Sequence, residues 1–182
     1  MTWITTYSGA KVDMLNTRPQ DIHQDDIAYS LARICRFNGH TNRFYSVAEH
    51  SVLMAEHLLK ADVGAPSRKM LRTILLHDAT EAYLGDLPAP VKKLLPDYKA
   101  LEARLEEVIA HRFRLYYPLP ELVKHLDSRI LLDERSNLLT FTDHKWDVDK
   151  TNLEPLGVTI NNWSSVVAEH HFRHLLLMNA AY

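Results

Sequence analysis

The sequence predicts an all-α domain that carries a short β-hairpin at its N-terminus. Beyond residue 20, apolar side chains recur every three or four residues in several segments, as they do along one face of a helix. Residues 3–13 form two short runs on either side of the turn-forming pair Ser8-Gly9, which is typical of a hairpin. With 182 residues, 46% of them apolar, the chain is expected to form one domain, with residues 1–20 as hairpin and lead-in and residues 21–182 as the helical core.

The first half of the chain shows three helix signals in turn. A helix is expected over residues 25–35. The next begins at Ser46, because Ser46 and Glu49 have the spacing of a capping box, and it carries His50. A third begins at Pro66 and Ser67. The buried stripe expected on this third helix consists of Met70, Leu71, Ile74 and Leu75.

The second half alternates proline-marked breaks with longer helices. Pro88 and Pro90 precede a short turn expected over residues 91–95. Another helix, expected over residues 120–142, carries Asp127. A loop over residues 144–157 separates it from a final helix over residues 163–179. Between the proline-marked turn and the Asp127 helix lies an amphipathic helix, whose apolar positions are Tyr98, Leu101, Leu105, Val108 and Ile109.

The composition excludes several classes of protein. The formal net charge is −2 with histidines neutral, so no basic field favours a nucleic-acid polymer. The sole cysteine, Cys35, excludes an intramolecular disulfide framework and suits a reducing compartment. Because no apolar run approaches about 18 residues and the N-terminus lacks a signal-peptide pattern, we expect a cytoplasmic protein with no membrane partner.

The adjacent pair His77-Asp78, at the end of the third apolar run, is the most informative feature for function. With His50 upstream and Asp127 downstream, it offers two imidazole nitrogens and two carboxylates. This donor set suits one divalent transition metal such as Co, Mn, Zn or Fe. Neighbouring residues point about 100° apart around a helix, so both can reach one ion only near a helix end or a distortion. Such an ion can activate water near neutral pH and offset the charge of a phosphate.

Three segments of the sequence resemble one family. They are RFNGHT (residues 36–41), FYSVAEHS (residues 44–51) and HDATEAYLGDLPAPVK (residues 77–92). The order of His50, His77-Asp78 and Asp127 is similar to the H…HD…D signature of the HD-domain metal phosphohydrolases. The longest segment resembles the HDxxE…GDxPxPVK pattern of 5'-deoxynucleotidases and of phage-type deoxynucleoside triphosphohydrolases. The resemblance spans roughly residues 5–140, and it implies an HD-domain helical bundle in which these four residues bind a single metal ion.

Two carboxylates in the longest segment are candidate catalytic residues. Glu81 lies four residues after His77 and three after Asp78, so a continuous helix would put all three on one face. A carboxylate there can orient or deprotonate the attacking water without binding the metal, and the resemblance implies the same role. Asp86 is by position an ordinary turn residue. The resemblance alone makes Asp86 a second catalytic carboxylate near the scissile ester.

Cationic and aromatic side chains are the candidate substrate contacts. Guanidinium and ammonium groups match phosphate oxygens. The candidates are Arg36, Arg43, Lys92 and Lys93, of which Arg36 and Lys92 lie within the matching segments. Phe37 stands where the resembling 5'-deoxynucleotidases carry a tryptophan that packs near the sugar, and a smaller ring can still exclude a ribose hydroxyl or stack on a base. Further candidates for either the base pocket or the core are Tyr83, Leu87 and Trp146.

The resemblance implies hydrolysis of the 5'-phosphate ester of a deoxynucleotide. A deoxynucleoside triphosphate triphosphohydrolase that favours dATP is the preferred interpretation, because the chain looks closer to the phage-type enzymes. A triphosphate would bring an additional Mg ion. A 5'-deoxynucleotidase acting on monophosphates is the alternative, and a catalytically idle HD module that only binds nucleotides is the alternative from another class. Relatives of this branch also tend to form homo-oligomers, so a homo-oligomer is expected.

Overall fold

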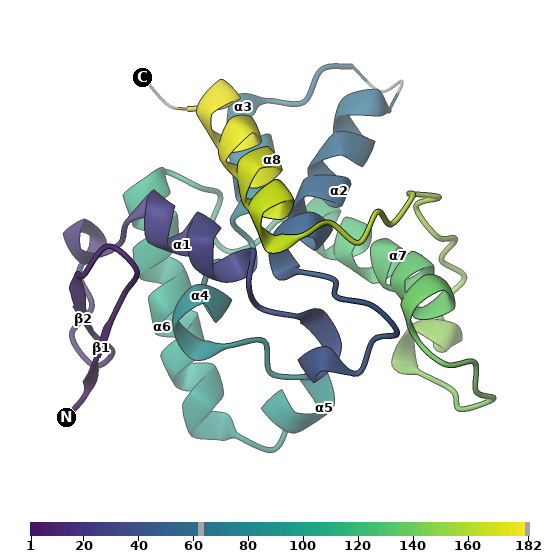
Figure 1. Cartoon of the computed structure of the whole chain (residues 1–182), viewed down its shortest axis with the longest axis horizontal. Helices are drawn as coiled ribbons and strands as arrows, with labels where there is room; N and C mark the ends of the chain where they lie inside the picture. Colours follow the sequence, from purple (N-terminus) through teal and green to yellow (C-terminus); the bar gives the residue numbers. More distant parts are fainter. Residues whose placement is uncertain (62–63, 181–182) are drawn as a thin grey trace.

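Helices make up nearly all of the regular structure in the computed structural model, which describes residues 1–61 and 64–180 (Figure 1). The predicted all-α fold with an N-terminal hairpin is therefore confirmed. The elements are, in chain order, β1 (Trp3–Thr5), β2 (Lys11–Asp13), the 3-10 helix η1 (Pro19–Asp21), α1 (Gln24–Leu31), the 3-10 helix η2 (Arg36–Gly39), α2 (Val47–Lys60), α3 (Arg68–Leu75), α4 (Glu81–Leu84), α5 (Ala89–Lys92), α6 (Pro96–Phe113), α7 (Glu121–Leu138), the 3-10 helix η3 (Asp147–Lys150) and α8 (Ser165–Met178).

The hairpin lies at one edge of the molecule, beside α6 (Figure 1). Its two strands are antiparallel, with Ile4 opposite the fully buried Val12. Its turn is fastened to α1 by one carboxylate, because Asp26 accepts hydrogen bonds from the Thr6 hydroxyl and from the backbone N–H and hydroxyl of Ser8, at 2.7 to 2.9 Å. A side chain on the first long helix thus fixes where the hairpin sits.

Helix α2 is the centre of the packing, because it contacts α1, α3, α7 and α8. Its first turn is capped as predicted, since the Ser46 hydroxyl accepts a hydrogen bond from the Glu49 N–H at 3.1 Å. The Glu49 side chain makes a different contact from the one that a capping box predicts. The buried Glu49 carboxylate instead accepts hydrogen bonds from the backbone N–H groups of Asn161, Asn162 and Trp163, which lead into α8.

Two predicted helices end early because their last backbone groups form hydrogen bonds with distant parts of the chain. Helix α1 ends at Leu31 rather than at residue 35, because the chain at residues 34–36 pairs with residues 45–47 through bonds such as the Val47 N–H to the Ile34 carbonyl, 3.1 Å. Helix α7 ends at Leu138 rather than at residue 142. There the backbone N–H of Asn42 donates to the Leu138 carbonyl at 2.8 Å, which satisfies the helix end.

The expected break near His77 is present. Helix α3 ends at Leu75, and residues 76–80 form tight turns before α4 begins at Glu81. The helix therefore stops just before the pair of adjacent residues that are expected to share one ion. Helix α5 begins at Ala89, earlier than the short turn predicted over residues 91–95. Among the described helices, none is both long and apolar enough to cross a lipid bilayer.

Candidate metal centre

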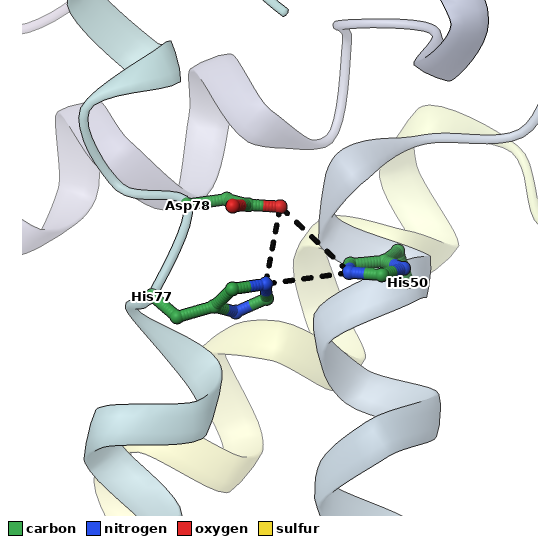
Figure 2. Close-up of side chains that lie close together, drawn as sticks. All are labelled: His50, His77 and Asp78. Atoms are coloured by element: carbon green, nitrogen blue, oxygen red, sulfur yellow. Dashed lines mark hydrogen bonds and ion pairs between the residues drawn. The ribbon is translucent and has the colours of Figure 1, made fainter. Parts of the chain in front are cut away.

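His50, His77 and Asp78 come from two elements and face one another (Figure 2). His50 lies in the first turn of α2, and the other two lie in the turns that follow α3. The two Nε2 atoms are 3.4 Å apart, and Asp78 Oδ2 is 3.2 Å from His77 Nε2 and 3.7 Å from His50 Nε2. The break after α3 is what allows His77 and Asp78 to point at the same place.

In the neutral imidazoles, the surrounding contacts favour the tautomer in which both facing nitrogens are acceptors. The Nδ1 atom of His50 lies 2.6 Å from a Glu134 carboxylate oxygen, and the Nδ1 atom of His77 lies 2.8 Å from the Ile74 carbonyl. Each acceptor draws the ring proton to Nδ1 and leaves a lone pair on Nε2. Two lone pairs that face each other repel unless a positive charge lies between them. This arrangement therefore fits a cation.

The spacing of these atoms also fits a metal ion. In a tetrahedral site with metal–nitrogen bonds of about 2.0–2.1 Å, neighbouring donor atoms lie about 3.3 Å apart. The distances from His50 Nε2 to His77 Nε2 and from His77 Nε2 to Asp78 Oδ2 are 3.4 and 3.2 Å. Imidazole and carboxylate donors together are typical ligands of divalent transition metals. The three residues could hold a metal ion, and their chemistry leaves its identity open.

Asp127 approaches this group from the third element, α7. Its Oδ1 atom lies 3.3 Å from His50 Nε2, and its side chain is 46% exposed, whereas His50 is fully buried. Asp127 therefore lies on the solvent-facing side of the buried group. The other three predicted metal ligands thus approach His50 Nε2: His77 and Asp78 form a tight group with it, and Asp127 lies on the open side of that group.

A second acidic residue of α7, Glu134, completes the surroundings, although it belongs to none of the motifs recognised in the sequence. Its side chain is fully buried, with one oxygen at His50 Nδ1 and the other 3.2 Å from the Arg36 guanidinium. Arg36 also lies 3.3 Å from Asp78 Oδ2. One signal in the sequence could have revealed Glu134: it follows Asp127 by two helical turns and so shares its face.

The close charges shift the pKa values of the group strongly. Burial alone would lower the pKa of His77, but the Asp78 carboxylate outweighs burial and raises that pKa to about 9. Burial would raise the pKa of Asp78, but His77, His50 and Arg36 together lower it far below its usual range. Without a metal, the charge between the donors is thus supplied by a proton.

The two candidate catalytic carboxylates lie beside the metal group. Burial and the neighbouring Asp78 charge raise the pKa of Glu81 well above its usual value. Lys92 Nζ lies 3.5 Å from Glu81 Oε1, while Glu81 Oε2 is buried with no hydrogen-bond partner among the described residues. Asp86 follows Gly85, whose positive φ of 80° turns the chain after α4, and burial raises the pKa of Asp86 as well.

A cavity of about 710 Å³ opens over these residues, within the usual range for a small-molecule site. Arg43 is not among its lining residues. Phe37 and Trp146 form an aromatic pair in its wall, with ring centroids 6.4 Å apart, and Lys93 bridges to Asp147 of η3 at 3.0 Å. Seven predicted site residues line the cavity: Arg36, Phe37, Asp78, Glu81, Asp86, Lys92 and Asp127.

Comparison with known proteins identifies the family. Residues 31–131, more than half of the chain, match the HD domain family, and the chain belongs to it. Members of this family are generally metal-dependent hydrolases, so the fold and site define a protein of that class.

Two curated relatives are similar to much of the chain. It is 41% identical to the uncharacterized protein YfdR of Escherichia coli K12 over 138 residues, which cover 76% of this chain and 73% of that protein. It is 42% identical to the uncharacterized protein RCAP_rcc00048 of Rhodobacter capsulatus over 125 residues, which cover 67% of this chain and 63% of that protein. Neither protein's name specifies a substrate.

Proposed function

We propose that this chain hydrolyses the 5'-phosphate ester of deoxynucleotides, and that deoxynucleoside triphosphates, dATP foremost, are its substrates. The observation that carries the proposal is the set of facing donors of His50, His77 and Asp78 beside a cavity large enough for a nucleotide. The resemblance of residues 36–51 and 77–92 to deoxynucleotide hydrolases supports the substrate class. The preference for dATP rests on that resemblance alone.

The reaction needs an activated water, a proton acceptor and a proton donor. A divalent ion held by His50, His77, Asp78 and Asp127 would acidify water and offset phosphate charge. Glu81 takes the proton of the attacking water, because its buried Oε2 atom has no other hydrogen-bond partner among the described residues and the raised pKa makes its carboxylate a stronger base. Water adds to the α-phosphorus, and the bond from phosphorus to the 5'-oxygen breaks. Burial raises the pKa of Asp86, which favours the protonated form, and Asp86 gives its proton to the leaving 5'-oxygen.

Cationic side chains of the cavity would bind the phosphates. Arg36, Lys92, Lys93 and Lys145 line it, more cations than one phosphate group needs, which favours a polyphosphate. Lys92 and Lys93 now pair with Glu102 and Asp147. A bound triphosphate would compete for these two lysines and would carry an additional Mg ion.

The nucleoside would bind at the aromatic pair. Phe37 and Trp146 lie in the cavity wall with ring planes tilted by 47°. An aromatic face stacks on any base, so this pair supplies affinity without fixing adenine. The ring of Phe37 would also lie near the sugar, where the resembling deoxynucleotidases carry a tryptophan.

A substrate panel tests the proposal. The protein is incubated with each dNTP, dNMP and rNTP in the presence of Mn²⁺ or Co²⁺, and products are separated by chromatography. We expect deoxynucleoside and intact triphosphate from dNTPs. Deoxynucleoside and inorganic phosphate from dNMPs alone would establish the 5'-deoxynucleotidase instead. Equal background turnover by wild type and Asp78→Ala would favour the idle nucleotide-binding module.

A further inference from the structure

Glu134 is a charged side chain in a place where charge is costly. It lies near the C-terminal end of α7 with none of its side chain exposed to solvent. Its two oxygens have different partners: one is 2.6 Å from His50 Nδ1, and the other is 3.2 Å from the Arg36 guanidinium. Replacing a buried ion pair by apolar residues is often neutral or stabilising. Stability alone is therefore a poor reason for this carboxylate.

The contacts of Glu134 close a ring around the metal group. From Glu134 the ring passes to Arg36, whose second terminal nitrogen lies 3.3 Å from Asp78 Oδ2. That same carboxylate oxygen is 3.7 Å from His50 Nε2, and the other nitrogen of His50 returns to Glu134. Two of the predicted metal ligands are thus held from behind by a single pair, Glu134 and Arg36. The pair joins α7 to η2, which are far apart in the sequence.

The chemistry of the carboxylate sets the state of His50. An ionised carboxylate only accepts hydrogen bonds, so Nδ1 must carry the ring proton and Nε2 must present its lone pair. His77 receives a weaker version of the same contact from the neutral carbonyl of Ile74. A charged acceptor gives the stronger hydrogen bond and also raises the basicity of the imidazole as a metal ligand.

We propose that Glu134 is a positioning residue of the metal centre, which orients His50 directly and Asp78 through Arg36. The proposal rests on the proposed metal site but adds a residue to it. It also gives Arg36 a task at the metal ligands in addition to phosphate binding. Neither residue touches the reacting atoms in this task. Each acts through the ligand that it holds.

The test compares two buried glutamates that flank the same histidine. Glu134→Gln keeps the shape of the side chain and removes its charge. Glu49→Gln makes the same change at an equally buried position next to His50, but there the partners are backbone N–H groups. Affinity for Mn²⁺ and Co²⁺ is measured by competition with a fluorescent chelator. We expect Glu134→Gln to weaken binding about 10- to 100-fold and Glu49→Gln to leave it within experimental error.

A second measurement uses the wild-type protein and does not depend on the variant folding. In Zn²⁺-loaded, ¹⁵N-labelled protein, the His50 Nδ1 proton should resonate farther downfield than that of His77, because its acceptor is charged. Glu134→Gln should move it upfield. A His50 proton that is no farther downfield than that of His77, or equal metal affinity in wild type and Glu134→Gln, would overturn the inference while leaving the metal site intact. A wild type that binds none of the three metals would overturn both proposals.

Discussion

Two neighbouring residues of α2 show two different ways to bury polar groups. The Glu49 carboxylate is surrounded by the backbone N–H groups of Asn161, Asn162 and Trp163 at 2.8 to 2.9 Å. The next residue, His50, is surrounded by side chains that can gain or lose protons. The first arrangement uses donors that cannot change charge. The second depends on protons or a cation to balance its carboxylates.

This difference separates a structural contact from a functional one. The Glu49 contact ties the chain before α8 to the central helix, and it is complete without any ligand. The cluster around His50 holds its lone pairs and carboxylates close together, an arrangement that repels itself unless positive charge is present. Burial alone therefore does not mark a functional residue. The chemical nature of the groups that contact a buried residue indicates whether it is functional.

The largest expected effect is the loss of turnover when the cluster around His50 loses one of its carboxylates. Asp78→Ala removes one donor of the tight group and should lower turnover of a deoxynucleotide by about a thousandfold or more, since a metal supplies several kcal/mol of transition-state stabilisation. Asp97→Ala, at an exposed carboxylate in the first turn of α6, is the control and should retain wild-type turnover. Retained activity in Asp78→Ala would contradict the functional role assigned to the cluster around His50.

Glu49→Ala should produce the reverse pattern. It leaves backbone N–H groups unsatisfied in the protein interior, and we expect a loss of about 2–4 kcal/mol in the free energy of unfolding. Urea denaturation measures that loss. Metal affinity in the folded variant should remain that of the wild type. A variant with full stability and impaired metal binding would reverse the roles assigned to the two residues.

The pH dependence sharpens the same contrast. The metal-free pKa of His77 is raised from 6.5 to about 9, so its protonated form stabilises the fold fully below pH 6.5 and this contribution is lost as pH rises through 9. Metal must displace that proton, so apparent affinity should strengthen as pH rises from 6 to 9. Calorimetry in buffers of different ionisation enthalpy would detect the released proton. Affinity that does not change over this range would contradict the prediction.

The smallest effect is expected at the rim of the cavity. Trp146→Ala removes one stacking surface, so KM for a deoxynucleotide should rise about tenfold, in line with the usual worth of a base–aromatic contact, with kcat little changed. Trp163→Ala, at an indole that stacks on His171 instead, is the matched control. Steady-state kinetics measure KM and kcat for both variants. An equal rise in KM in the two variants would show that Trp146 does not bind the substrate.

Local signals account for most of what the sequence predicted correctly. The Ser8-Gly9 turn, the Ser46 cap and the helix break at His77 each depend on neighbouring residues, and each is present. The early end of α7 depends on Asn42, which lies far away in the chain. No local pattern could reveal that contact.

The site also combines residues that local motifs predict with a residue that only distant contacts reveal. Its motif residues carry recognisable spacing, so His50, His77 and Asp78 are found together as expected. Glu134 matters only through His50 and Arg36, which reach it from two other elements. Its role becomes visible once α2, α7 and η2 are assembled.

The central claim is tested most directly by locating the ion. Anomalous scattering from crystals soaked in Co²⁺ should show one strong peak about 2.0–2.2 Å from the Nε2 atoms of both His50 and His77, with the Asp78 carboxylate beside it. A soaked crystal with no peak at this position, and the two histidines turned away from each other, would contradict the account.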